Sequence, residues 1–192
     1  MKIKIWLFFS FVFLSSSQIF CQDTICIEEL IKYYNLHYNI NNIEYVIFPK
    51  CPDDYLTSNN YYTSHIYANY NIVSIDKVLE IDSLAFEFVK KQKKMPNQGF
   101  GNCPIIKDNW ENYCRQVICY IEKKGRRKYE EIIQINYIHN SEIVQFKKDY
   151  ELYGTFETDF KKSWIEVLDG CSFFFNIYYN VTKNKIDKFI VN

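Results

Sequence analysis

Glycine is scarce in this sequence, which has five glycines and four prolines in 192 residues. A loop that cradles phosphates, or a fingerprint that binds a dinucleotide, needs several glycines because the backbone must approach the phosphates closely. The chain has neither pattern, and it lacks the Gly-x-Ser-x-Gly turn that carries the nucleophile of many hydrolases. These absences argue against nucleotide-binding proteins of the P-loop and Rossmann types and against α/β-hydrolases.

Histidine is rarer still, and the three residues, His37, His65 and His139, lie in separate segments. None belongs to an HExxH or His-x-His pattern, and none has a carboxylate at metal-ligand spacing. The sequence has no CxxC pair either. We therefore predict no metal site and no cofactor, and we interpret each histidine as a surface residue or a hydrogen-bonded structural one.

A surplus of charge is also missing, since 23 Lys and Arg balance 23 Asp and Glu. Proteins that bind nucleic acids through the phosphate backbone usually carry a basic surplus, so we predict no nucleic-acid partner. Two local basic runs occur, at residues 90–94 and 123–128. The second surrounds Gly125 between two strand-like segments, which favours a solvated hairpin turn; a patch for an anionic ligand or a membrane surface is the alternative.

Long hydrophobic runs are absent as well. The apolar run at residues 5–14 is too short for a transmembrane helix, which needs roughly 20 residues. It follows two lysines and precedes a polar stretch, as in a secretory signal. We predict that residues 1–21 are a signal peptide cleaved after Cys21, and that the rest is exported to the periplasm, the cell surface or the medium without a transmembrane anchor. In the alternative, a lipoprotein, Cys21 would carry lipid, but that processing favours a small residue where Phe20 stands.

Cleavage after Cys21 would leave six of the seven cysteines in the mature chain. An even number in an exported chain suggests up to three disulfides, which a chain of this length needs only as reinforcement. Cys114 and Cys119 would face opposite sides of a strand, so each would pair elsewhere unless the segment is not a strand. The disulfide candidates are Cys26, Cys51, Cys103, Cys114, Cys119 and Cys171.

Helical periodicity appears in two segments. Apolar residues share one side of a helix in residues 24–34. Residues 75–93 contain neither Gly nor Pro, and Ser74 is available as the N-cap. Asp82 interrupts the apolar stripe of this second helix, and a strand in its second half is the competing interpretation.

Alternation of apolar and polar residues predicts strands at residues 43–48, 113–122, 129–138, 163–168, 172–181 and 186–191. Residues 53–70 read as a long loop. Because short connections favour antiparallel neighbours, we predict an α+β fold with N-terminal helices packed on one face of a curled antiparallel meander of four to five strands. The sequence has no repeat or linker, so we expect residues 22–192 to form a single globular domain.

Two stretches of this β-rich part have recognisable patterns. Residues 110–121, WENYCRQVICYI, contain a Tyr-x-Arg-Gln segment and are followed, after a Gly-containing turn, by an Ile-Asn-rich strand; residues 168–174, LDGCSFF, run on to a C-terminal Ile-Val-Asn. Together they resemble small exported proteins of unknown function from the flavobacterial lineage. The resemblance implies export and an α+β sheet domain but no reaction. Cys114 and Cys119 depart from its pattern, which leaves the disulfide pairing open.

Few residues suggest a binding site. Arg115 lies within an apolar strand segment, where it could hold a carboxylate ligand bidentately, form an internal salt bridge or face outward. Tyr137 and Tyr179 either line a pocket between the long helix and the concave face of the sheet or belong to an ordinary core. With Arg115 they are our candidate ligand-site residues. We predict no catalytic residue, and we expect an exported, non-catalytic binding or interaction module with a small-molecule or protein ligand.

Two other functions remain as alternatives. A hydrolase could use paired carboxylates, and Glu157 and Asp159 would share one face of a strand. Other acidic pairs occur at residues 53–54 and 130–131. The second alternative is a structural component of the cell envelope.

Overall fold

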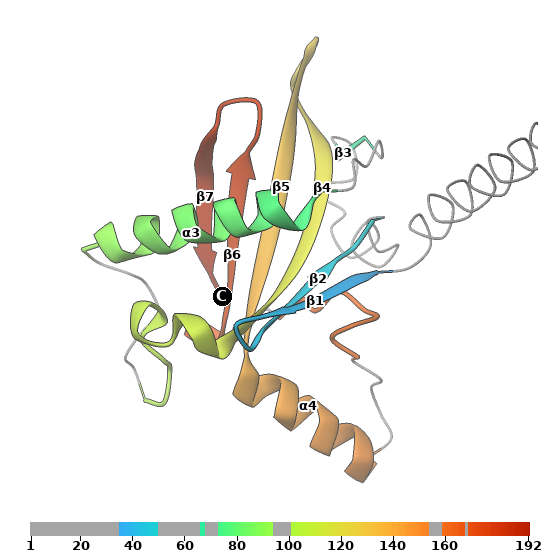
Figure 1. Cartoon of the computed structure of the whole chain (residues 1–192), viewed down its shortest axis with the longest axis vertical. Helices are drawn as coiled ribbons and strands as arrows, with labels where there is room; N and C mark the ends of the chain where they lie inside the picture. The colour runs from blue at the N-terminus through green and yellow to red at the C-terminus, as the bar shows by residue number, and fades with distance from the viewer. Residues whose placement is uncertain (1–34, 50–65, 68–72, 94–100, 154–158, 168) are drawn as a thin grey trace, which may run out of the picture. The chain divides into compact units, whose positions relative to one another are not determined.

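The computed structural model describes residues 35–49, 66–67, 73–93, 101–153, 159–167 and 169–192. All of them lie within one structural unit, Asn35–Asn192. The strands are β1 (Leu36–Ile40), β2 (Ile43–Ile47), β3 (Ile66–Tyr67), β4 (Tyr113–Gly125), β5 (Lys128–His139), β6 (Phe174–Asn180) and β7 (Lys185–Val191) (Figure 1). The helices are α3 (Ile75–Lys91) and α4 (Asn140–Tyr153), with 3-10 turns η1 (Ile106–Asp108), η2 (Trp110–Asn112) and η3 (Cys171–Phe173).

One sheet organises the unit, in the order β1-β2-β4-β5-β6-β7, and the two-residue β3 also pairs with β4. Neighbouring strands are antiparallel except β2 and β4, which run parallel. A parallel pair needs a long crossover between its strands, and α3 lies in the chain between β2 and β4. Figure 1 shows α3 crossing one face of the sheet.

The predicted arrangement is therefore wrong. We expected N-terminal helices on an antiparallel meander of four to five strands, whereas the sheet has six strands in its main path and the helix on its face, α3, comes after β2. β4 to β7 do form a meander, but the β1–β2 hairpin extends it through a parallel contact that local periodicity does not reveal. The predicted helix at residues 24–34 lies outside the described residues, as does the predicted loop at 53–70 apart from β3.

The β1–β2 hairpin was only half predicted, because its first strand was missed. Asn41 and Asn42 form the turn with positive φ angles of 52° and 65°. A two-residue turn with positive φ at both positions suits the twist of a hairpin, and Asn tolerates this conformation better than most residues. The Asn-Asn pair was thus the available sequence signal for β1.

Helix α3 begins as predicted. The Ser74 side chain accepts a hydrogen bond from the Lys77 N–H at 3.3 Å, which satisfies one free backbone donor of the first turn. The residues buried on its inner side are Val78, Ile81, Asp82, Ala85 and Val89. The predicted helix is confirmed, and the competing strand is wrong.

The predicted strand at residues 163–168 is also wrong. Residues 159–167 form an irregular segment, here named the strap, which contains no strand. Phe160 and Ile165 of the strap are buried in a core with residues of β4, β5 and β6. Apolar residues in the strap thus reflect burial, but its backbone does not join the sheet ladder.

The backbone of the strap forms hydrogen bonds with side-chain amides of the sheet, where a strand would bond to a neighbouring strand. Gln116 Nε2 donates to the carbonyl oxygens of Phe160 and Ser163, at 2.8 and 2.7 Å, and Gln116 Oε1 accepts the Ile165 N–H at 2.9 Å. Asn136, the register partner of Gln116 on β5, donates to the Ile165 carbonyl oxygen at 2.7 Å. A buried backbone group needs such a partner, so these two amides fix the path of the strap.

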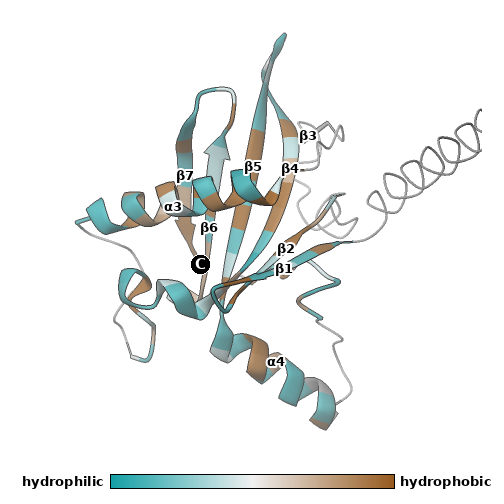
Figure 2. Cartoon of the chain, viewed as in Figure 1, coloured by the Kyte–Doolittle hydropathy of each residue, from teal (hydrophilic) through white to brown (hydrophobic). Residues whose placement is uncertain are grey.

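Cores lie on both faces of the sheet. α3 packs on one face, where Ile81 meets residues such as Ile135; on the other face, Ile118 and Ile138 pack with Phe160 of the strap. Hydrophobic stretches along β4 and β5 are visible in Figure 2. Each fully buried aliphatic side chain contributes about 1.5–3 kcal/mol relative to exposure, so the two central strands stabilise the fold from both sides.

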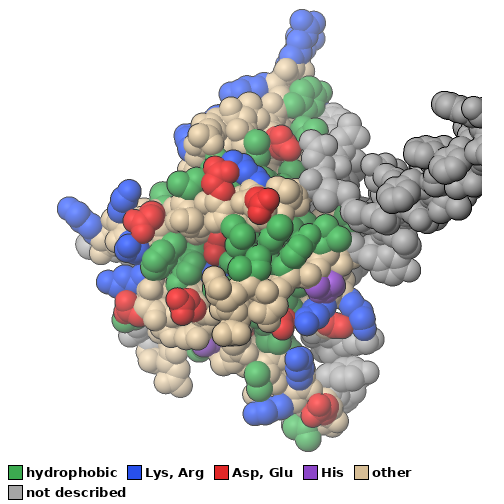
Figure 3. Space-filling view, in the orientation of Figure 1, with side chains coloured by type: hydrophobic (Ala, Val, Ile, Leu, Met, Phe, Trp, Pro, Cys, Tyr) green, Lys and Arg blue, Asp and Glu red, His purple; other side chains and the backbone are tan. Residues whose placement is uncertain are grey.

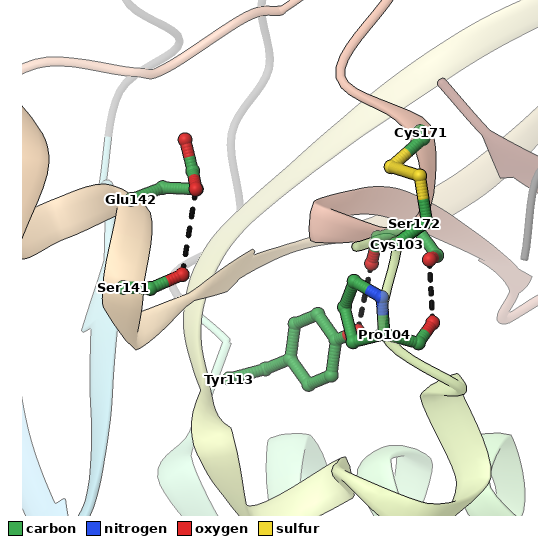
Figure 4. Close-up of a disulfide and its surroundings, with 7 residues drawn as sticks. All are labelled: Cys103, Pro104, Tyr113, Ser141, Glu142, Cys171 and Ser172. Carbon is green, nitrogen blue, oxygen red and sulfur yellow. Dashed lines mark hydrogen bonds between the residues drawn. A yellow bond between two sulfur atoms is a disulfide. The ribbon is translucent and has the colours of Figure 1, made fainter. Parts of the chain in front are cut away.

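A disulfide joins Cys103, which precedes η1, to Cys171 in η3, with a Cα–Cα distance of 6.2 Å. Next to it, Ser172 Oγ donates to the Pro104 carbonyl oxygen, and the Tyr113 hydroxyl donates to the Ser172 carbonyl oxygen at 2.7 Å (Figure 4). A disulfide of this kind fits a secreted protein. Within the described ranges, no helix is long and apolar enough to cross a membrane.

Candidate functional site

Arg115 lies on β4 beneath α3 and is completely buried. Its Nε donates to Asp82 Oδ1 at 3.2 Å, and its terminal nitrogens donate to the backbone carbonyl oxygens of Tyr113 and Trp110. The guanidinium carbon also lies 5.3 Å from the centre of the Trp110 ring and 5.1 Å from that of Tyr137. The sequence left three roles open for Arg115: a ligand contact, an internal salt bridge or an outward position. In the structure Arg115 forms the internal salt bridge.

Asp82 is the partner that completes this arrangement from α3. Its Oδ2 accepts the Tyr45 hydroxyl at 3.0 Å, and its Oδ1 accepts the Tyr137 hydroxyl at 2.8 Å as well as Arg115 Nε. Donors from β2, β4 and β5 therefore converge on one helical carboxylate. Asp82, Arg115, Tyr45, Tyr137 and Trp110 are named the buried cluster.

The electrostatics of the buried cluster favour a structural role. Burial, followed by the negative charge of Asp82, raises the pKa of both Tyr45 and Tyr137, so the two phenols stay protonated as hydrogen-bond donors. The carboxylate accepts from three donors, and its charge is balanced by the guanidinium. A buried pair arranged in this way holds the helix in one register on the sheet.

The structure brings two of the three candidate ligand residues together and separates the third. Arg115 and Tyr137 share the carboxylate, while the buried Tyr179 donates its hydroxyl to Asn184 Oδ1 in the β6–β7 turn. The residue that sequence reasoning missed is Asp82. Its interruption of an apolar helical stripe was the signal, because a buried carboxylate requires a partner.

The acidic pairs of the hydrolase alternative are only partly described. Asp159 stabilises the turn that opens the strap, since its Oδ1 accepts the Lys161 N–H at 2.9 Å and its Oδ2 lies 3.1 Å from Lys162 Nζ. Glu157 and residues 53–54 lie outside the described residues. No group of three or more His, Cys, Asp or Glu side chains in the described part of the chain could hold a metal ion.

Cys114 and Cys119 lie on β4 and contribute to the cores on opposite faces of the sheet, as predicted for a strand. Cys114 is an unpaired thiol whose Sγ donates to Asn140 Oδ1 at 2.9 Å, and burial raises its pKa to about 12. A thiol that stays protonated is a poor nucleophile. Cys26 and Cys51 lie outside the described residues.

His139 is the last residue of β5 and directly precedes helix α4. Its Nδ1 accepts the Ser141 N–H at 3.3 Å and lies 2.8 Å from Ser141 Oγ, which is 3.4 Å from Glu142 Oε1 (Figure 4 shows the latter contact). The acceptor role of Nδ1 places the ring proton on Nε2, and burial lowers the pKa of the ring. The His139 side chain therefore caps the first turn of α4. His65 lies outside the described residues.

A hollow of about 200 Å³ lies beside the β1–β2 hairpin, between Tyr38, His37 and Lys161. Lys161 Nζ lies 3.5 Å from Glu44 Oε1, so the acid and the base at this hollow balance each other. Ligand pockets for drug-sized molecules usually measure about 300–1,000 Å³. This hollow, which lies among described residues, is too small for such a ligand.

Basic side chains gather at the end of the sheet where the β4–β5 and β6–β7 hairpins turn (Figure 3). This surface, named the basic end, consists of Lys123, Lys124, Arg126, Arg127, Lys128, Lys183 and Lys185. The strand segments there carry four acidic residues, Glu122, Glu130, Glu131 and Asp187. The basic end therefore has seven basic and four acidic residues, a local surplus of positive charge in a chain whose formal net charge is zero.

Glu130 holds the two hairpins of the basic end together. Its side chain is 1% exposed, and its two oxygens lie 2.9 Å from Lys128 Nζ and 2.8 Å from Lys183 Nζ. Asn180 also donates to Glu130 Oε2, at 2.7 Å. Hydrogen bonds from Lys183 and Lys128 lower the pKa of Glu130 to about 2. The carboxylate therefore stays ionised and fixes a lysine from each hairpin at this end of the sheet.

Comparisons with protein-family models, with curated proteins and with solved structures find no match to this chain. The resemblance to exported proteins of the flavobacterial lineage stays a prediction.

Proposed function

We propose that this chain is an exported, non-catalytic binding module that acts through its outer surface. In this proposal residues 1–21 form the signal peptide, cleavage follows Cys21, and the mature domain works in the periplasm, at the cell surface or in the medium. The Cys103–Cys171 disulfide supports an oxidising compartment. The predicted resemblance to small exported flavobacterial proteins implies the same location.

The observation that carries the binding role is the contrast between the interior and the basic end. Beneath α3, Asp82 binds Arg115, Tyr45 and Tyr137, so the candidate ligand residues Arg115 and Tyr137 already bind a carboxylate of the chain itself. At the basic end, Arg126 and Arg127 are exposed, and neither has an ion-pair partner among the described residues. Unpaired surface charge at one end favours binding over a purely structural role in the envelope.

Retention on the envelope fraction of the producing cells tests this proposal. The mature chain should bind in a saturable way, and Asp159→Asn should leave the binding unchanged because Asn can still accept the Lys161 N–H. Asp159 is the described member of the carboxylate pair that a hydrolase would use, which makes this variant a matched test. Absence of retention, or release of soluble fragments from the envelope that Asp159→Asn abolishes, would overturn the proposal.

A further inference from the structure

We infer that the basic end is a docking surface for an anionic lipid bilayer; this inference rests on the proposed binding function and names its partner. The geometry of the β4–β5 hairpin is the first argument. β3 pairs with β4 no further than Glu122. β6 pairs with β5 from Ile132, and the Glu131 carbonyl oxygen also accepts the Val181 N–H at 2.9 Å. The tip of the hairpin between these points therefore extends past its neighbours as a two-stranded ribbon (Figure 1).

The charge on this ribbon is the second argument. Lys124 lies 2.6 Å from Glu122, and Lys128 pairs with Glu130. The turn residues Arg126 and Arg127 have no ion-pair partner within the described ranges and stand at the outermost point of the ribbon. Cations placed on a projecting point reach the phosphate layer of a flat surface before any other part of the hairpin.

Shape and chemistry select the bilayer among polyanions. A projecting tip offers little enclosure to a single strand of nucleic acid or polysaccharide, but it can rest on a plane. Tyr129, directly after the lysine of the turn, is 49% exposed. A tyrosine beside lysine and arginine suits the membrane interface, where the ring enters the headgroup layer and the cations meet lipid phosphates.

The lysines that pair with Glu130 and Asp187 extend the basic end beyond the β4–β5 hairpin. Glu130 links Lys128 to Lys183, and Asp187 lies 3.3 Å from both Lys183 and Lys185. These contacts orient the β6–β7 turn toward the same end of the sheet as the arginines. Lys183 and Lys185 therefore add to the basic end behind the projecting tip (Figure 1).

Vesicle co-sedimentation tests the inference with the secreted chain and two lipid compositions, phosphatidylcholine alone and phosphatidylcholine with phosphatidylglycerol. We expect binding to the anionic vesicles only, and a strong decrease at high salt because the Debye length falls from about 30 Å at 0.01 M to about 3 Å at 1 M. Each basic residue near the surface contributes about fivefold to the partition coefficient. Arg126→Gln/Arg127→Gln should therefore weaken binding about 25-fold.

The matched control removes two charges elsewhere. Lys147 and Lys148 are exposed on α4, at the other end of β5 from the arginine turn. Lys147→Gln/Lys148→Gln should leave vesicle binding within about twofold of the parent chain, since an exposed charge beyond one Debye length of the membrane is screened.

Three results would overturn the inference: equal binding to neutral and anionic vesicles, equal losses in the two double variants, or binding to dextran sulfate or single-stranded DNA without binding to anionic vesicles. If vesicle binding fails while envelope retention persists, the lipid partner is wrong and the proposed function stands. If both fail, the proposed function is wrong as well.

Discussion

Asp82 offers the most direct test of the buried cluster. Asp82→Asn keeps the shape of the side chain but removes the charge that balances Arg115, whose side chain is 0% exposed. The amide has one oxygen, so the three donors from Tyr45, Tyr137 and Arg115 cannot all keep an acceptor. Breaking a buried pair by removing one partner costs about 3–5 kcal/mol. That is a large part of the roughly 5–15 kcal/mol that stabilises an ordinary domain.

Urea unfolding of the protein at pH 7, followed by tryptophan fluorescence, measures this loss. Glu80→Gln on the same helix is the matched control, because Glu80 forms an ion pair with Lys77 at 2.8 Å but its side chain is 54% exposed. An exposed pair contributes at most about 1 kcal/mol. If Asp82→Asn unfolds at a urea concentration close to that of Glu80→Gln, the buried cluster does not stabilise the fold as argued.

A milder variant gives an answer even if Asp82→Asn does not fold. Tyr137→Phe removes one hydroxyl donor and leaves the salt bridge and the stacked ring in place; the Tyr137 ring lies 4.3 Å from that of Phe175. A hydrogen bond to a charged group contributes about 1.5–3 kcal/mol. We expect a loss of that size, and a loss below about 0.5 kcal/mol would contradict the described hydrogen bond.

Three further predictions concern other parts of the fold. Gly170→Ala should destabilise the protein by about 1–3 kcal/mol in urea unfolding, since the added Cβ would lie 2.3 Å from an aromatic carbon of β6. Gly125→Ala, with nothing within 4 Å of its Cβ, should not destabilise the protein in this way, and equal losses would contradict the packing at Gly170. In an NMR titration, Lys183→Gln should move the pKa of Glu130 upward from about 2 toward its ordinary 4.5. The pKa of Glu130 is lower in the folded than in the unfolded chain, so Glu130 stabilises the fold above pH 4.5 and loses this effect as the pH falls toward 2. Lys183→Gln narrows the pH range over which this stability is lost. An unchanged pKa of Glu130 in the variant would refute the pairing. Iodoacetamide should modify Cys114 only after unfolding, because its folded pKa is about 12, and rapid labelling of the folded chain would disprove its burial.

Local periodicity was enough to predict the elements whose pattern is set within one helix or one strand. The apolar stripe and Ser74 located α3, and alternation located β4 to β7, because each pattern follows from the geometry of one helix or one strand. Their order in the sheet depended on contacts between distant residues. The parallel register of Tyr45 with Arg115, for example, joins positions that no local pattern connects.

The strap shows why an apolar segment can be mistaken for a strand. Ile165 is buried like a strand residue, but its N–H and carbonyl oxygen bind Gln116 and Asn136 side chains. The sequence contains both amides within strands, yet it does not show which backbone they bind.

The candidate site was predictable in its parts but not in its assembly. Arg115 within an apolar strand and Asp82 within an apolar helical stripe each indicated a buried charge in need of a partner. Their distance of 33 positions in the chain hid the pairing. The basic run at residues 123–128 was visible from the start, whereas its connection to the β6–β7 turn depends on Glu130 and Lys183.

The central claim is that the domain is exported and matures under oxidising conditions. The mass of the protein recovered outside the cytoplasm tests this claim most directly. Peptide mapping without reduction should show an N-terminus at Gln22 and a cross-linked pair of peptides containing Cys103 and Cys171. A chain that keeps residues 1–21, or in which these two cysteines are reduced, would contradict export.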